Sequence, residues 1–114
     1  MNYKIIYDRL IAFRKQNIPT SGYTETHHIL MKSLGGSDEA HNLVSLTGRE
    51  HYIAHLLLAK FNLCKQTILA LQMMQMRSKT NDQRPYIRSS RMYEWARKQF
   101  SKFISENSKG KQNS

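Results

Sequence analysis

The sequence contains very little that could cross-link it or hold it in a membrane. Cys64 is the single cysteine among 114 residues, so no disulfide can form within the chain. No apolar run approaches the roughly 20 residues of a membrane-spanning helix, and no signal-peptide pattern is present. We therefore exclude a disulfide-stapled secreted domain and expect a cytoplasmic protein with no membrane partner.

Acidic residues are also scarce. Eight Asp and Glu stand against 18 Lys and Arg, which gives a formal net charge of +10. Such an excess favours a polyanionic partner, because Lys and Arg side chains release the counterions that surround a phosphate backbone. The same charge also suits a solvated basic surface with no particular target. Composition therefore points to nucleic acid and leaves the simpler interpretation open.

The length of the chain and the spacing of its apolar residues indicate one domain with a modest core. Apolar side chains three and four positions apart predict a helix over residues 2–16, which ends before Pro19. Residues 63–77 and 90–106 repeat this spacing and predict two further helices. Residues 107–114 have nothing to bury, so we expect a flexible basic tail there.

Histidine is the most informative residue of this chain. All five histidines lie between positions 27 and 55. Neutral imidazole is among the commonest metal ligands, and a metal centre needs donors that converge from separate segments. His27, His28, Asn42, His51 and His55 together form an array that can build a hydrolytic metal site.

The second half of this array is expected on a helix. Thr47 and Glu50 have the spacing of a capping box, so a helix should begin near Gly48. His51 and His55 are then one turn apart on one face, within reach of a single ion. Two solvated or core-edge histidines would show the same spacing, so the pair alone leaves both possibilities open. The other apolar residues of this helix are expected to face the core: Ile53, Ala54, Leu57, Leu58 and Phe61.

The first half of the array is expected on a strand. Residues 22–29 are rich in threonine, follow a turn cluster and predict a short strand. A turn-forming stretch at 34–38 then leads to a second short strand over 42–46. Neighbouring side chains of a strand point to different sides, so one of His27 and His28 can bind an ion while the other addresses the substrate.

The run from Glu25 to His55 resembles the HNH endonucleases, also called ββα-metal or His-Me finger nucleases, in the variant whose metal is held by three histidines. Identity, order and spacing agree at six positions: Glu25, His27, His28, Asn42, His51 and His55. The resemblance implies a ββα-metal core over about residues 22–61 within a mostly helical α+β fold. One nuclease domain would span 1–114, with a helical scaffold at 2–16 and 63–106. His27, His51 and His55 would bind one divalent cation.

The resemblance places the other matched residues in catalysis. His28 would be the general base, while Asn42 would pin the loop backbone and orient His28. Glu25 matches an acidic position often seen in this group. Met31 departs from the pattern, because many relatives carry proline there. Imidazole suits the role of base, since its ordinary pKa of about 6.5 lies near neutral pH.

The activity implied by the resemblance is hydrolysis of DNA, with double-stranded DNA expected as the substrate. One active site would cut one strand and leave 5′-phosphate and 3′-hydroxyl ends. Magnesium or manganese would serve in function, and three nitrogen ligands would also suit zinc or nickel. The chain is also similar to free-standing HNH proteins of bacteriophages, some of them homing endonucleases, which suggests a bacterial or phage-infected host cell. The sequence leaves a monomer and a homodimer equally open.

Basic side chains outside the array are candidates for contacts with the DNA backbone. They are Arg49, Arg77, Lys79, Arg84, Arg88, Arg91, Arg97 and Lys98. The alternative function is a DNA-binding module that cuts nothing and holds a structural zinc. Such sites usually have four protein ligands and favour cysteine, and the fourth ligand here would have to be His28, beside His27 on one strand. The sequence therefore favours a nuclease.

Overall fold

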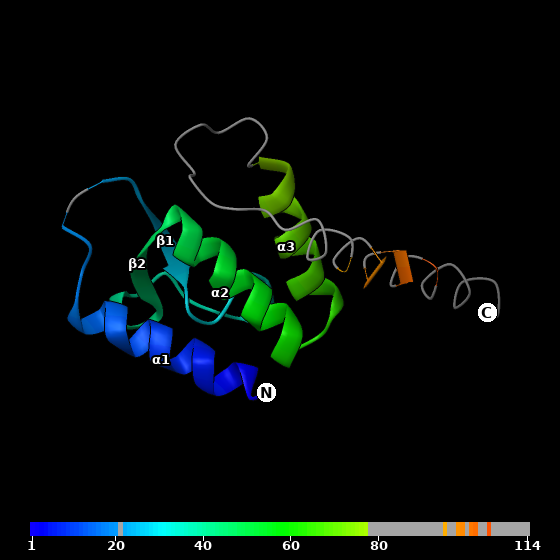
Figure 1. The fold of residues 1–114 in the computed structure, drawn as a ribbon, viewed down its shortest axis with the longest axis horizontal. Helices are drawn as coiled ribbons and strands as arrows, with labels where there is room; N and C mark the ends of the chain where they lie inside the picture. The colour runs from blue at the N-terminus through cyan, green and yellow to red at the C-terminus, as the bar shows by residue number, and fades with distance from the viewer. Residues whose placement is uncertain (21, 78–94, 96–97, 100, 103–104, 106–114) are drawn as a thin grey trace.

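Three helices and a two-stranded antiparallel sheet form the fold in this computed structural model, which describes residues 1–20, 22–77, 95, 98–99, 101–102 and 105 (Figure 1). The order is α1 (Tyr3–Gln16), β1 (Thr24–His28), η1 (Lys32–Leu34), η2 (Ala40–Asn42), β2 (Leu43–Thr47), α2 (Gly48–Phe61) and α3 (Lys65–Arg77). The predicted mostly helical α+β fold, with its strand–loop–strand–helix unit, is confirmed. Within the described residues, every helix is too short or too polar to cross a bilayer.

Helix α1 begins and ends at asparagines. The Asn2 side chain accepts a hydrogen bond from the Ile5 amide at 3.1 Å, and the helix continues as far as Gln16, before Asn17. An asparagine at the N-cap satisfies an amide that would otherwise lack a partner within the helix. One face of α1 is buried through Tyr7 and Ile11. This face packs against the strand–loop–strand–helix unit and becomes one wall of the core.

The sheet determines which side chains of β1 lie together. Strands β1 and β2 pair antiparallel, with Glu25 opposite Leu46 and His27 opposite Val44. Because alternate residues share a face, Glu25 and His27 are on the same side of β1. The connection between the strands contains η1 and η2 and folds back on itself, so that the Ile29 amide donates to the Asn42 carbonyl at 2.8 Å.

The first turn of α2 is fixed by two reciprocal hydrogen bonds. The Glu50 amide donates to the Thr47 hydroxyl at 3.2 Å, and the Thr47 amide donates to the Glu50 carboxylate at 3.0 Å. The predicted capping box and the predicted start at Gly48 are therefore confirmed. Arg14 of α1 also binds this carboxylate, through Nε and Nη2 at 2.9 Å. The forked contact ties α1 to the end of α2 that carries the histidines.

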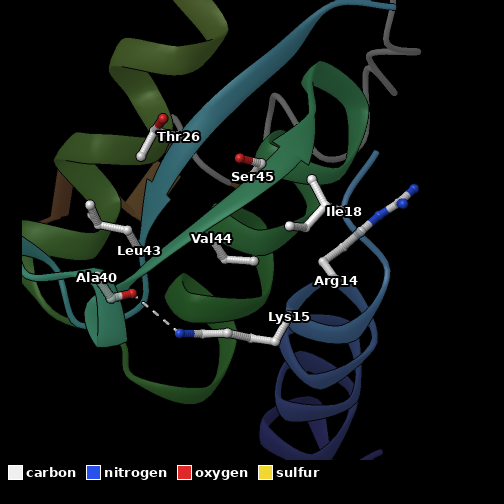
Figure 2. A pocket seen from close by; sticks show the side chains of 8 residues that line it. All are labelled: Arg14, Lys15, Ile18, Thr26, Ala40, Leu43, Val44 and Ser45. Atoms are coloured by element: carbon white, nitrogen blue, oxygen red, sulfur yellow. Dashed lines mark hydrogen bonds between the residues drawn. The ribbon is translucent and has the colours of Figure 1, made fainter. Parts of the chain in front are cut away.

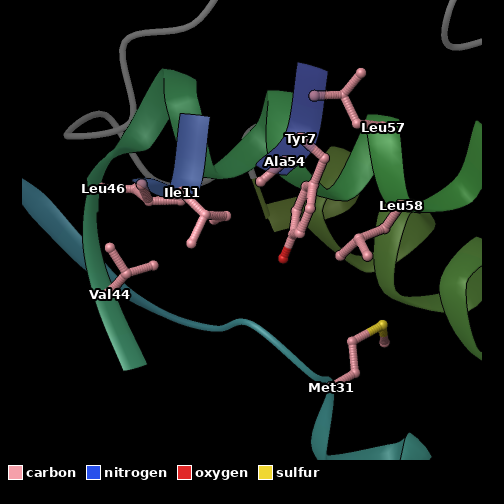
Figure 3. Packing of buried hydrophobic residues seen from close by; sticks show 8 residues of the cluster. All are labelled: Tyr7, Ile11, Met31, Val44, Leu46, Ala54, Leu57 and Leu58. Carbon is pink, nitrogen blue, oxygen red and sulfur yellow. The ribbon is translucent and has the colours of Figure 1, made fainter. Parts of the chain in front are cut away.

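The main core lies where α1, β2 and α2 meet (Figure 3). Its buried members are Tyr7, Ile11, Met31, Val44, Leu46, Ala54, Leu57 and Leu58. The expectation that Ile53 faces this core is wrong, because its side chain remains 36% exposed. Instead Tyr52, at 4% exposure, is buried on the side of α2 that faces α3. Helix α2 packs between α1 and α3, so it has two buried sides.

Helix α3 begins two residues later than position 63. The Thr67 hydroxyl donates to the Asn62 carbonyl at 2.7 Å, and the Cys64 amide donates to the Thr67 hydroxyl at 3.2 Å. These bonds hold Asn62 and Cys64 in the turn that precedes the helix. A second buried cluster joins α2 to α3: Tyr52, Ala59, Ile68, Leu71 and Met74. The tail predicted over 107–114 lies outside the described residues, as does most of the helix predicted over 90–106.

Candidate metal centre

Three imidazoles converge between β1 and α2. The ring centroid of His27 lies 5.1 Å from those of His51 and His55, which are 4.9 Å from each other. One nitrogen from each ring lies within 4.8 Å of the other two. Separations of this size allow a single ion to be reached by all three rings after small side-chain rotations. Three neutral nitrogen donors are also a donor set that divalent transition ions accept.

The convergence follows from local structure on both sides. His27 is directed by the register of β1 toward α2, on the same face as Glu25. His51 and His55 lie one turn apart in the first half of α2, where the Thr47 cap fixes the start of the helix. The histidine pair and the strand histidine therefore meet because the turn between β2 and α2 brings their elements together.

His27 is the most deeply buried of the three. Its side chain is 1% exposed, and its Nε2 lies 2.8 Å from the Tyr7 hydroxyl of α1. Its Nδ1 is buried and has no hydrogen-bond partner within the described residues. Burial, with the nearby rings of His55 and His51 adding to it, lowers the pKa of His27 to about 2. The ring is therefore neutral at ordinary pH and keeps a lone pair for a cation.

A carboxylate accompanies the second imidazole. The Nδ1 of His51 lies 2.7 Å from Glu25 Oε1, and the Tyr23 hydroxyl donates to Glu25 Oε2 at 2.5 Å. Since an ionised carboxylate only accepts hydrogen bonds, His51 carries its proton on Nδ1. Glu25 thus contacts one of the three converging rings. A carboxylate in this position holds a ring in one orientation and raises its basicity toward a metal.

His28, the neighbour of His27, has a different environment. Its side chain is 28% exposed, and its Nε2 lies 2.8 Å from Asp38 Oδ1. The other oxygen of Asp38 accepts from the Lys32 ammonium at 3.2 Å. The hydrogen bonds from His28 and Lys32 hold the pKa of Asp38 below its usual range. A charged carboxylate thus bridges an imidazole and an ammonium at the edge of the site.

These groups surround a cleft of about 320 Å³ beside the three rings. One side is formed by His51 and His55 of α2, and the other by His28 and Lys32. Two of the three sequence-predicted ligands, His51 and His55, therefore line one cavity with the sequence-predicted base His28. The position of Asp38 across from His28 was not anticipated, because it depends on how the connection between the strands folds.

The connection between the strands is pinned by a single buried side chain. Asn42, 7% exposed, accepts from the Leu30 amide at 2.8 Å and donates to the Leu30 carbonyl at 2.9 Å. It also donates to the Ser37 carbonyl at 2.8 Å. Gly36 allows this close approach, since a Cβ atom there would collide with the Leu30 carbonyl. The loop that follows His28 is thereby closed on itself from inside.

The backbone of Met31 has the conformation that proline, the residue that many HNH endonucleases carry at this position, would impose. Its φ of −62° and ψ of 144° are values that proline favours. The methionine side chain is 8% exposed and packs in the main core (Figure 3). The departure from the family pattern therefore keeps the local geometry and adds apolar burial.

Only part of the predicted DNA-contacting set falls among the described residues. Arg49 is exposed on the first turn of α2, and Lys98 is exposed farther along the chain. Arg77 is the last residue of α3. The remaining candidates lie outside the described residues: Lys79, Arg84, Arg88, Arg91 and Arg97.

A second cavity, of about 380 Å³, lies between the end of α1 and the strands (Figure 2). It is larger than the histidine cleft but has no comparable chemistry. Arg14 at its rim is bound to Glu50, and Lys15 donates to the carbonyls of Ala40 and His41 at 3.4 and 2.9 Å. Both cations are bound to other groups of the protein, so we place the functional site in the smaller cavity.

Three residues near the histidines were missed by the sequence analysis. Tyr7 belonged to the apolar stripe of the first helix, and this stripe gave no sign that its hydroxyl reaches a histidine. Asp38 and Lys32 belonged to a turn-forming stretch without periodicity. The sequence offered one usable signal, the acidic Asp38 and the basic Lys32 flanking the Gly-Gly pair at 35–36.

The chain is similar to four proteins named as probable mobile endonucleases of Enterobacteria phage T4. It is 45% identical to Probable mobile endonuclease E over 103 residues, which cover 90% of this chain and 72% of that protein. It is 39% identical to Probable mobile endonuclease B over 113 residues, which cover 96% of this chain but 41% of that protein. No protein-family model matches the chain, and no solved structure matches it.

Proposed function

The chain belongs to the family of the phage T4 probable mobile endonucleases, and we propose that it is an HNH-type, metal-dependent endonuclease acting on double-stranded DNA. The observation that carries the proposal is the meeting of three imidazoles within 4.8 Å of one another, with a fourth, His28, on the same cleft. We treat residues 1–114 as one nuclease domain. Its place of action would be the cytoplasm of a phage-infected bacterial cell.

His27, His51 and His55 would hold one divalent cation. The buried and unpartnered Nδ1 of His27 supports this assignment, because an apolar surrounding tolerates such an atom poorly unless it gains a partner. When bound, the cation supplies Lewis-acid stabilisation of the charge that develops on phosphate oxygens. Magnesium or manganese would serve in the cell, while zinc or nickel would fit three nitrogen ligands.

His28 would act as the general base. Its Nε2–H donates to the Asp38 carboxylate, so Nδ1 is the nitrogen that takes a proton from the attacking water. As that proton moves to His28, the water oxygen bonds to phosphorus and the bond from phosphorus to the 3′ oxygen breaks. The departing oxygen takes a proton from solvent. These steps leave a 5′-phosphate and a 3′-hydroxyl.

Two residues of the predicted catalytic set would act through histidines. Asn42 fixes the loop after His28 by its bonds to Leu30 and Ser37, and so restricts where the base can lie. Glu25 contacts His51 rather than the open cleft, so we assign it to orienting a ligand. Both are positioning residues in this proposal.

Binding of the substrate would rest on basic side chains around the cleft. Lys32 lines the cavity beside His28, and Arg49 is exposed on the first turn of α2, two residues before His51. Such cations attract the phosphate backbone without reading its sequence. One cleft with one base would cut one strand in each event, so the expected first product is a nick.

A non-catalytic DNA-binding module with structural zinc is the competing function. The histidine cluster found among the described residues has three members, whereas structural zinc sites usually have four protein ligands. His28, the candidate fourth, is bound to Asp38 instead. These contacts favour an open centre over a closed one.

The decisive experiment is incubation of supercoiled plasmid with the protein and magnesium or manganese, with and without a chelator. A nuclease converts supercoiled DNA to nicked circles only when the cation is present. The His28→Ala variant is the matched control, because it removes the base and keeps the three ligands. DNA that is retarded in a gel but stays supercoiled would establish the binding module instead.

A further inference from the structure

The Tyr7 hydroxyl sits between two groups of the strand that carries the first histidine. It lies 2.8 Å from His27 Nε2 and 3.0 Å from the Ile29 carbonyl oxygen. Tyr7 is 3% exposed, and its ring packs in the core between α1 and α2. Figure 3 shows the hydroxyl pointing away from α1, toward the chain that leaves β1. Water is therefore kept from this hydrogen-bonded trio.

The directions of these two hydrogen bonds are fixed by proton count. A tyrosine hydroxyl has one proton, and a carbonyl oxygen can only accept. The contact with Ile29 therefore uses the Tyr7 proton, and the bond to His27 must be donated by Nε2–H to the Tyr7 oxygen. It follows that His27 carries its proton on Nε2 and its lone pair on Nδ1. This Nδ1 is the buried atom that lacks a partner within the described residues.

We propose that Tyr7 is a positioning residue that selects the Nε2–H tautomer of His27 and so presents Nδ1 to the cation. The inference rests on the proposed function, since it needs the three histidines to form a metal centre. His51 has the opposite tautomer, because its contact with Glu25 keeps the His51 proton on Nδ1 and leaves the lone pair on Nε2. The centre would therefore combine an Nδ1 ligand from the strand with an Nε2 ligand from the helix.

The consequence of losing the hydroxyl is specific. In Tyr7→Phe the ring and its packing remain, but the buried Nε2–H of His27 loses its acceptor. Binding of a cation at Nδ1 then requires a tautomer that the protein no longer stabilises. Removal of partners behind metal-bound histidines typically weakens metal affinity about 10–100-fold, and we expect the same range here.

Tyr52→Phe provides a matched control. Tyr52 is 4% exposed, and its hydroxyl accepts a hydrogen bond from Gln75 Nε2 at 3.1 Å, at the second cluster. Its replacement also removes one buried hydroxyl from the core. Any general loss of stability should therefore be common to both variants, while an effect on the metal should be confined to Tyr7→Phe.

The test has two readouts on the full chain. Two-bond proton–nitrogen NMR correlations of the metal-free protein report the tautomer of His27, and the proposal expects a proton on Nε2. Isothermal titration with manganese and with zinc then compares wild type, Tyr7→Phe and Tyr52→Phe. We expect about 10–100-fold weaker binding in Tyr7→Phe and wild-type binding in Tyr52→Phe.

Two outcomes would overturn the assignment. One is a proton on His27 Nδ1 in the metal-free wild type, a result that does not depend on whether Tyr7→Phe folds. The other is wild-type metal affinity in a folded Tyr7→Phe protein. Failure of the metal centre itself has a different signature: the wild type would bind neither ion, or His55→Ala would titrate as the wild type does.

Discussion

Two parts of the histidine site are held by different kinds of contact: the three converging imidazoles, and the loop side, which consists of His28 at the end of β1 and the connection that follows it. Each of His27 and His51 has its own partner, Tyr7 and Glu25, inside the packed body of the protein. On the loop side, His28 and Lys32 share one exposed carboxylate, that of Asp38. A buried polar contact is protected from water and salt, whereas an exposed ion pair gains little from Coulomb attraction.

The comparison suggests a division of labour. The proposed ligands have partners within the packed body, and a metal centre needs donors that keep their distances before the ion arrives. On the loop side, the buried side chain of Asn42 closes the connection on itself, and the 28% exposed side chain of His28 would present the proposed base to DNA.

Replacing His28, the proposed base, should give the largest change in activity. His28→Ala is expected to lower the cleavage rate by about 10²–10⁴-fold, the usual contribution of a general base. Metal affinity should stay within about twofold of wild type, because His28 is bound to Asp38 and not to the three rings. Plasmid nicking and calorimetric titration measure the two quantities. Loss of metal binding in this variant would show that the two sides of the cleft are not separate.

Removing the anchor of the loop should affect both stability and cleavage. Asn42→Ala breaks three hydrogen bonds to Leu30 and Ser37 and leaves their backbone groups without these partners. We expect a loss of about 2–4 kcal/mol in the free energy of unfolding, measured by chemical denaturation. Asn17→Ala is the control, since the Asn17 side chain donates only to the exposed Phe13 carbonyl. Equal losses in the two variants would contradict the anchoring role.

The buried ligand should make the metal-free protein sensitive to acid. The folded state keeps His27 neutral, with a pKa lowered to about 2, whereas the unfolded chain takes a proton near pH 6.5. The stabilisation is therefore complete above about pH 6.5 and is lost as the pH falls toward the folded pKa, by up to about 1.4 kcal/mol per pH unit. Denaturation curves in chelator between pH 7.5 and 5 measure this slope.

Two variants separate this effect from general acid sensitivity. His27→Asn should flatten the dependence, because the residue that resists protonation is gone. His41→Asn should leave it unchanged, since the His41 side chain is 75% exposed. A slope in His27→Asn as steep as in the wild type would mean that other groups govern the acid response.

The ion pair that joins α1 to α2 should contribute a moderate amount. Arg14 and Glu50 have side chains 18% and 21% exposed, and their forked contact fixes the end of α2 that carries the ligands. Although burial alone would raise the pKa of Glu50, the hydrogen bonds from Arg14 and Thr47 hold it below its usual range. We expect Arg14→Gln to cost about 1–2 kcal/mol in thermal or chemical unfolding.

The exposed pair Lys4–Asp8 offers a matched comparison on the same helix. Its side chains are 63% and 56% exposed, and the residues are four positions apart. Lys4→Gln should change stability by less than about 0.5 kcal/mol. Similar losses of stability for Arg14→Gln and Lys4→Gln would indicate that the forked contact stabilises the protein no more than an exposed ion pair does.

The smallest effect is expected from the exposed carboxylate of the loop. Asp38→Asn keeps the shape of the side chain but removes the charge that orients His28 and Lys32. We expect cleavage to fall by up to about tenfold, with stability unchanged, because the contact lies in solvent. Faster cleavage by this variant would mean that Asp38 competes with the DNA phosphate, and would reverse its role in the proposal.

Local signals in the sequence were sufficient for most of the described fold. The Thr47–Glu50 capping box located the start of α2, a threonine-rich run after a turn cluster located β1, and a short run after the turn-forming stretch at 34–38 located β2. These predictions succeeded because each depends on residues that are close together in the sequence. The burial of Ile53 was predicted wrongly, since its side chain is 36% exposed and Tyr52 is the neighbouring residue of α2 that is buried in the cluster with α3.

Sequence alone determined which donors could form a metal centre: one histidine on a strand and two at helical spacing, placed by the periodicities of strand and helix. Tertiary structure decided which hydrogen-bond partner orients each imidazole ring. Tyr7 reaches His27 from twenty residues away and Glu25 reaches His51 across the strand–helix contact. Such pairings arise from packing between distant segments, and burial then gives each hydrogen bond its strength. No local pattern of residues encodes them.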